Sequence, residues 1–274
     1  MSRPVKTTSY MSPVWFRADL PRESAVGYWA GPHARIAGRL PNMAEYVQRH
    51  FSPTDHGYWP SSPTVGTTVP ANWRCDGVAE VRFGSTVAAL AMPMHMREVY
   101  LDEQNLFERV LRQVTGPGGG RWWTDGHDDA VGHRTVLRRR RGVRGRAFRA
   151  YVHDRIGPAL HEAGARDLRT YTFLPWSRFV HPTLGVGHDT PTFRRYHGSV
   201  VVGADSRAAV EELLKSEQVA GIVADQHIGP DGRLRLHRGT ERAGRPSVTP
   251  SRVSPGFRGG RVQPQLQAVV GKAA

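Results

Sequence analysis

Two periodicities of apolar and polar residues follow each other along this chain, in the same order in both halves. In the first half, short aromatic or alternating runs predict strands at 10–17, 43–51 and 77–84. Apolar residues three and four apart predict helices at 21–40 and from Thr86 onward, the second through the segment 102–114. The glycine-rich run at 116–120 is expected to stop that second helix.

The helix predicted at 21–40 has one apolar face. That face is formed by Val26, Trp29, His33, Ile36 and Leu40. Pro21 suits a first helical turn because no hydrogen bond is lost there, whereas Pro32 lies inside the run and predicts a kink.

The second half repeats the pattern. Strands are predicted at 133–139, 167–174, 197–203 and 233–237, with helices at 147–163 and after the capping residues Asp205 and Ser206. Each half therefore has the β-α-β-β-α-β order of a ferredoxin-like unit, and the predicted class is α+β. Because helices cover only one sheet face, the two units are expected to pack sheet on sheet, with a cavity between the sheets. The expected domains are 1–125 and 126–240, followed by a basic tail at 241–274.

Positive charge is concentrated in two places. The 274 residues include 38 Lys and Arg against 24 Asp and Glu, a net charge of +14. Eight arginines and no acid lie between Arg134 and Arg149, and the tail adds five arginines and one lysine against Glu241. The tail has few large apolar residues, so we expect it to be disordered. No aromatic residues alternate with the arginines of the run at 138–141, so nucleic-acid binding is not the favoured interpretation.

Composition excludes several classes of protein. Hydrophobic residues are 39% of the chain, which argues against wholesale disorder. No apolar run is long enough to predict a membrane helix, and the N-terminus lacks the apolar core of a signal peptide, so the expected location is the cytoplasm. Cys75 is the one cysteine, which excludes an internal disulfide and a cysteine-ligated metal. No metal site, phosphate loop or dinucleotide fingerprint is predicted.

The segment from Tyr28 to Phe51, YWAGPHARIAGRLPNMAEYVQRHF, resembles the EthD-like proteins of the dimeric α/β-barrel superfamily. Their pattern has a Tyr-Trp pair, a histidine four residues after the tryptophan, a Leu-Pro turn and a strand that contains tyrosine and ends in histidine. Here Asn42 stands where glycine is usual, and the run 102–107 is similar to the end of the same module. The match covers roughly 10–115, and it implies a dimeric α/β-barrel-type sandwich within one chain.

The resemblance implies an enzyme that acts on an aromatic or other apolar small molecule. Relatives are associated with ether oxidation or with dehydration and decarboxylation of polyketides, so an oxidoreductase or a lyase is expected. No bound cofactor is predicted, although some members of the superfamily bind haem. A homodimer is a further expectation.

Five residues are the candidates for the site. His33 lies on the apolar face of its helix and is predicted to act as general base or acid, with His50 as a second catalytic candidate. Tyr28, Trp29 and Tyr46 are expected to line the pocket and orient the substrate. The alternatives are a structural role for these side chains in a non-catalytic binding module, or an RNA-associated protein.

Overall fold

The computed structural model describes residues 3–53, 59–60, 71–124, 131–138, 144–177, 181–191, 195–226 and 237–240. The predicted basic tail and residues 139–141 of the arginine run lie outside this part of the chain. Within it, no helix is both long enough and apolar enough to cross a membrane.

The first half follows the predicted order with one further strand. Its elements are β1 (Val5–Phe16), α1 (Arg22–Tyr28), the π-helical turn η1 (Trp29–His33), α2 (Ala34–Ala37), β2 (Met43–His50), the 3-10 turn η2 (Ala71–Trp73), β3 (Gly77–Phe83), α3 (Thr86–Ala91), the 3-10 turn η3 (Met92–His95), α4 (Arg97–Leu106), β4 (Phe107–Val110) and β5 (Gln113–Trp122). Pro32 lies inside η1, where the wider turn accommodates a residue without an N–H donor.

The second half has its strands and helices in the predicted order, except that residues 233–236 of the last predicted strand lie outside the described residues. Its elements are β6 (Val131–Arg138), α5 (Gly145–Ala150), the π-helical turn η4 (Tyr151–Ile156), α6 (Gly157–Glu162), β7 (Asp167–Phe173), β8 (Gly198–Ala204), α7 (Arg207–Lys215), α8 (Glu217–Asp225) and β9 (His237–Thr240). Ser206 caps α7 as predicted, because its side chain accepts a hydrogen bond from the backbone of Ala209.

The helix predicted through 102–114 is wrong beyond Leu106. The chain turns extended at Phe107 and forms β4 and then β5, which contains the glycine-rich run. These glycines serve close packing: a Cβ on Gly120 would lie 2.3 Å from Oγ1 of Thr7, and one on Gly119 would lie 2.9 Å from the carbonyl oxygen of Thr172. Strand β5 therefore fits between β1 and β7 because it lacks side chains there.

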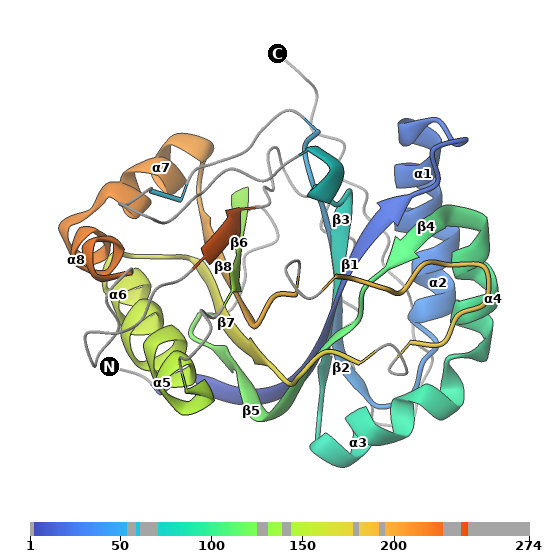
Figure 1. The fold of residues 1–274 in the computed structure, drawn as a ribbon, viewed down its shortest axis with the longest axis horizontal. Helices are drawn as coiled ribbons and strands as arrows, with labels where there is room; N and C mark the ends of the chain where they lie inside the picture. Colours follow the sequence, from blue (N-terminus) through green and yellow to red (C-terminus); the bar gives the residue numbers. More distant parts are fainter. Residues whose placement is uncertain are drawn as a thin grey trace.

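All nine strands belong to one antiparallel sheet, and each half pairs its strands in the same order. The first half pairs them as β4-β1-β3-β2 and the second as β9-β6-β8-β7. Strand β5 joins the halves by pairing with β1 on one side and β7 on the other. Helices α1 to α4 cover the first half and α5 to α8 the second, so the sheet lies between two helix layers (Figure 1).

The sheet curls until strands of the two halves face each other across a charged interior. Arg49 on β2 donates to Asp167 on β7 at 2.9 Å, and Arg169 on β7 donates to Glu80 on β3 at 2.8 Å. The hydroxyl of Tyr171 also donates to Glu80. These groups are almost completely buried, and because each charge has a partner, the interior tolerates them.

Candidate functional site

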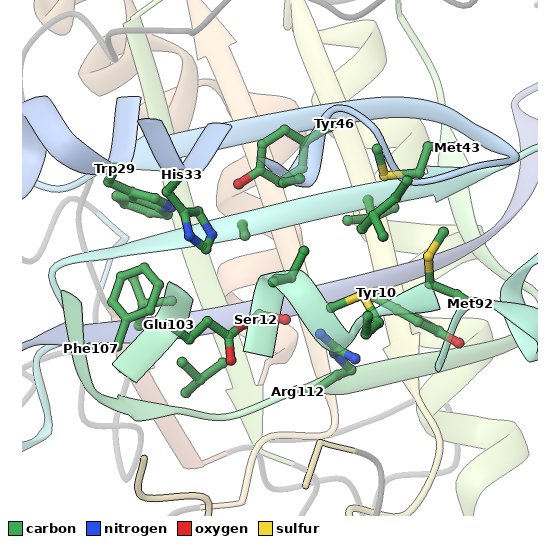
Figure 2. A pocket seen from close by; sticks show the side chains of 18 of the residues that line it. Tyr10, Ser12, Trp29, His33, Met43, Tyr46, Met92, Glu103, Phe107 and Arg112 are labelled. Atoms are coloured by element: carbon green, nitrogen blue, oxygen red, sulfur yellow. The ribbon is translucent and has the colours of Figure 1, made fainter. Parts of the chain in front are cut away.

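A cavity of about 40 Å³ lies in the first half, between η1, α2, η3 and α4 on one side and β1 to β4 on the other. The predicted position of the cavity, between the two sheets, is therefore wrong. The ion pairs of Arg49 and Arg169 occupy that interior. Most of the lining is apolar. Its polar members are Tyr10, Ser12, His33, Tyr46, Glu103 and Arg112. Figure 2 shows His33 and Tyr46 along one side of the cavity and Glu103 and Arg112 along the other, with Tyr10 near Arg112.

His33 is held by a carboxylate at the back of its ring. Its Nδ1 lies 2.7 Å from Oδ2 of Asp102 on α4, and both side chains are buried. Because an ionised carboxylate can only accept, the proton of the neutral ring lies on Nδ1, and Nε2 of that form keeps its lone pair. The ring also packs edge-on against Phe107, with 5.5 Å between centroids. His33 lines the cavity, so Nε2 is the nitrogen that can exchange a proton with a molecule there.

Asp102 remains ionised because two donors hold it. Its Oδ1 accepts from the hydroxyl of Tyr28 at 2.6 Å, while Oδ2 accepts from His33. Burial raises the pKa of Asp102, but the hydrogen bonds from His33 and Tyr28 outweigh this and place the pKa below its usual value. The bond to Asp102 in turn raises the pKa of Tyr28. Tyr28 therefore supports the carboxylate and does not itself line the cavity.

Tyr46, Gln48 and His50 share the face of β2 that is turned toward the helices, as the alternation predicts. Nε2 of Gln48 donates to the hydroxyl of Tyr46 and to the backbone carbonyl of Trp29, both at 2.9 Å. Burial raises the pKa of Tyr46 far above its usual value, so the hydroxyl keeps its proton. Trp29 and Tyr46 both line the cavity.

His50 lies behind the cavity wall. Its ring is 4.5 Å from the Trp29 ring, and its Nε2 lies 3.2 Å from Oε1 of Gln48. Burial and the nearby charge of Arg22 lower the pKa of His50 to about 4. A neutral imidazole that does not line the cavity can position Trp29 and Gln48 but has no direct path to a molecule bound there.

Glu103 connects the cavity to a segment of the second half. Its Oε2 accepts from Nε2 of His181 at 2.6 Å and from the hydroxyl of Thr183 at 2.8 Å. Burial raises the pKa of Glu103, but the contacts with His181, Arg112 and Thr183 outweigh this and lower it below the usual value. The same segment adds Gly187 beside Arg109 of β4 as an isolated parallel bridge. Residues of the segment 181–191 therefore hold the Glu103 carboxylate in place at the cavity wall.

Sequence reasoning assigned no role to Asp102, Glu103 or Arg112. The only signal was the similarity of the run 102–107 to the end of the EthD-like module, which marks the segment without saying what its carboxylates do. Asp102 lies 69 residues from His33 along the chain, so no local spacing could have paired them.

Comparison with known proteins places the fold. No family model matches the chain, and no curated protein matches it. Among solved structures, an anthrone oxidase-like protein superposes with a TM-score of 0.54 and 10% identity, over 92% of this chain and 95% of that chain. A candidate monooxygenase from Fusobacterium nucleatum subsp. nucleatum gives a TM-score of 0.50 and 6% identity, over 89% and 97% of the two chains. The chain therefore shares its fold with these two structures.

The prediction that the protein works without a cofactor is contradicted by a third similarity. Chlorite dismutase from Candidatus Nitrospira defluvii is among the similar structures, with a TM-score of 0.44 and 8% identity over 85% of this chain and 92% of that chain, and chlorite dismutases are haem proteins.

The cavity beside His33 does not fit a haem. Its volume is about 40 Å³, whereas pockets for larger organic ligands measure roughly 300–1,000 Å³. A second hollow, of about 440 Å³, opens beside Arg146, Arg149 and His197 in the second half, and none of the predicted site residues line it. Among the described residues, no group of three His, Cys, Asp or Glu side chains could hold a metal ion.

Proposed function

We propose that the protein is a small-molecule enzyme of the oxidoreductase type in which His33 moves a proton to or from the bound substrate. The observation that carries this is the contact between Asp102 and Nδ1 of His33, at the wall of a cavity. Asp102 fixes the tautomer and stabilises the imidazolium that forms when Nε2 accepts a proton. The similar anthrone oxidase-like and candidate monooxygenase structures support this class of reaction in the fold.

The proposed substrate is an apolar, in particular an aromatic, small molecule. Apart from six polar side chains, the cavity is lined by aromatic and aliphatic groups, which would bind such a molecule by excluding water. The cavity volume of about 40 Å³ is room for about three water molecules, so a larger substrate would enter by displacing flexible side chains. Met43, Met92 and Met96 line the cavity and can repack in this way.

The proposed architecture is a tandem of two ferredoxin-like units within one chain, 1–125 and 126–240. The identical strand orders of the halves support this division. We place the site in the first unit and close to the EthD-like pattern, with His33 catalytic and Trp29 and Tyr46 at the substrate. Tyr28 and His50 act through Asp102 and Trp29, respectively.

A non-catalytic binding module is the alternative, and it predicts a cavity with apolar walls only. The presence of His33, Tyr46, Glu103 and Arg112 in the lining favours the enzyme. The arginine run that would support an RNA-associated protein lies mostly outside the described residues.

The experiment compares turnover of His33→Gln with that of the wild type. Anthrone is the first substrate to assay, by oxygen uptake and product absorbance, followed by smaller phenols and ketones. Glutamine keeps the bulk and can hydrogen-bond to Asp102 but cannot titrate, so kcat should fall by about 10²–10⁴ while the melting temperature changes little.

His153→Gln is the matched control. His153 is a buried histidine in η4 of the second half, bonded through Nδ1 to Thr170 at 2.8 Å, and it does not line the cavity. Its substitution should leave turnover within about twofold, because it removes a titratable ring remote from the proposed chemistry. A stable His33→Gln protein with full turnover would remove His33 from the mechanism.

A further inference from the structure

Arg112 is a buried cation at the cavity wall whose hydrogen bonds are incomplete. It lies between β4 and β5, is 7% exposed and lines the cavity opposite His33 (Figure 2). Its Nη1 donates to the hydroxyl of Tyr100 at 3.2 Å, and its guanidinium lies 5.4 Å from the centre of the Tyr10 ring. Its Nε is buried and has no hydrogen-bond partner within the described part of the chain.

The buried N–H donor at Nε of Arg112 is stabilised when it has a hydrogen-bond acceptor. Leaving such a group without a partner destabilises the fold, and more so when the group is charged. A fold retains that cost most readily where the acceptor arrives with a ligand, and Arg112 faces the cavity that a ligand would enter. An oxygen acceptor on a molecule bound in the cavity would complete the hydrogen bonding of Arg112.

The charge of the resting cavity indicates what kind of oxygen this is. Glu103 contributes one negative charge and Arg112 one positive charge. Oε2 of Glu103 already accepts hydrogen bonds from His181 and Thr183. The two charges balance, so the resting site can take up a neutral molecule, and the charge of Arg112 is available to an oxygen that becomes negative. A carbonyl oxygen accepts hydrogen bonds while neutral and gains negative charge when a neighbouring C–H bond loses its proton.

We propose that Arg112 binds the carbonyl oxygen of the substrate and stabilises the oxyanion formed when His33 removes a proton from the adjacent carbon. This inference rests on the proposed function and narrows its substrates to small, largely apolar carbonyl compounds with an acidic C–H bond. The C–H bond breaks and its proton goes to Nε2 of His33. The electron pair forms a C=C bond to the carbonyl carbon, and the π electrons of the C=O bond move to oxygen.

The step balances without an oxidant and produces an enolate paired with an imidazolium. The oxyanion then accepts N–H bonds from Arg112, and Asp102 stabilises the protonated His33 from behind. Arg112 lies at the wall of a largely apolar cavity and Asp102 is buried behind His33, so both charges act where electrostatic interactions are stronger than in bulk water. Any later reaction of the enolate would start from this common intermediate.

The test uses 4-nitrophenol as an enolate mimic, because its phenolate is planar, carries its charge on one oxygen and absorbs differently from the neutral phenol. The pH midpoint of ionisation of the bound probe is measured by absorbance. The wild type should bind the phenolate at least tenfold more tightly than the phenol, which lowers the midpoint by one unit or more. Arg112→Gln should abolish this preference, and Arg112→Lys should restore much of it because the charge returns.

Arg109→Met is the matched control. Arg109 lies on β4, pairs with Glu108 at 3.7 Å, stacks on Trp15 and does not line the cavity, so its loss removes the same charge from the neighbourhood without touching the site. It should leave the midpoint of the bound probe unchanged. Melting curves of each variant report folding, and should Arg112→Gln fail to fold, the Arg112→Lys midpoint compared with that of Arg109→Met decides.

Several results would overturn the inference. They are absence of 4-nitrophenol binding to the wild type, binding without a shifted midpoint, and an equal shift in Arg112→Gln. A further contrary result would combine two observations: bound 4-nitrophenol ionises at the wild-type midpoint in Arg109→Met, and at its unshifted midpoint in a folded Arg112→Lys. That combination would count against an electrostatic role of Arg112. His33→Gln should keep the shifted midpoint, so the oxyanion site is read separately from the proton transfer tested by turnover.

Discussion

In both halves of the molecule the first helix passes through a π-helical turn beside a Gly-Pro pair. Gly31-Pro32 lies inside η1, and Gly157-Pro158 directly follows η4. The residue after the proline is His33 in the first half and Ala159 in the second. His33 borders a cavity and reaches Asp102, whereas Ala159 is part of a continuous apolar core.

The second half has a continuous apolar core that the first half lacks. Tyr151, Ile156, Leu160 and Leu168 are all at most 1% exposed, and they pack with valines of β8 and the helices α7 and α8 beneath the second helix layer. In the first half, a comparable layer is divided into separate clusters around a cavity with buried charges. The same strand order thus supports a continuous apolar layer in the second half and a layer with a cavity and buried charges in the first half. We expect the first half of the chain to be the less stable of the two.

The largest difference should appear in activity when Asp102 is neutralised. Asp102→Asn places an amide beside Nδ1, and an amide NH₂ favours the tautomer in which Nε2 carries the proton and cannot act as a base. Turnover should fall by about 10²–10⁴ with the fold retained. Asp154→Asn is the control from the second half, where Asp154 is exposed and pairs with Arg121 at 2.6 Å. Equal turnover in both variants would show that Asp102 is structural.

A second pair of substitutions tests the packing beside each Gly-Pro pair. A Cβ on Gly157 would lie 2.1 Å from the Trp123 ring, which is anchored by its hydrogen bond to Thr170, so Gly157→Ala should destabilise the protein by about 1–3 kcal/mol. A Cβ on Gly31 meets nothing nearer than Nη1 of Arg35 at 3.9 Å, so Gly31→Ala should stabilise by about 0.5–1 kcal/mol. Urea denaturation measures both. Similar costs at the two positions would contradict the contrast in packing.

The pH dependence of protein stability should reveal the buried histidine of the second half, His153. Burial and the charges of Arg121 and Arg149 lower the pKa of His153 from 6.5 to about 3. Between these values the unfolded chain binds a proton that the folded protein does not, so the free energy of unfolding falls as the pH decreases. The slope from this one group is about 1.4 kcal/mol per pH unit.

His153→Gln should therefore flatten the stability curve between pH 6.5 and 5 by that amount. His50 and His181, whose pKa values are each lowered to about 4, add slopes of the same sign and remain in the variant. The measurement is urea denaturation at several pH values. An unchanged slope in His153→Gln would mean that His153 is protonated in the folded state.

The elements and the face of the first helix were predictable because they depend on local periodicity. Val26, Trp29, His33 and Ile36 recur at helical spacing, so the inward position of His33 follows from the sequence. The strand that carries the glycine-rich run was not predictable, because glycine usually interrupts strands, and only the neighbours Thr7 and Thr172 show why it is needed.

The rest of the site depends on contacts between distant residues. Asp102 and Glu103 are adjacent on α4, yet one holds His33 and the other binds His181 from the second half. The pairing of Arg49 with Asp167 joins residues 118 positions apart. This ion pair occupies the interior between the two halves of the sheet, where the sequence had predicted a cavity. Periodicity assigns a residue to a face but does not select its partner on another element, so these contacts required the structure.

The smallest effect should come from a feature that the two halves share. Ser85 caps α3 by accepting a hydrogen bond from the backbone of Ala88 at 3.1 Å, and Ser206 caps α7 in the same way through Ala209, also at 3.1 Å. Ser85→Ala and Ser206→Ala each remove one cap and should each destabilise the protein by about 0.5–2 kcal/mol. Because the caps are far apart in sequence and share no partner, the double variant should lose close to the sum of the two. Thermal and urea denaturation measure the three variants. A cost at Ser206 with none at Ser85 would mean that the helices beside the cavity unfold locally before the rest, so that the two halves differ in cooperativity as well as in packing.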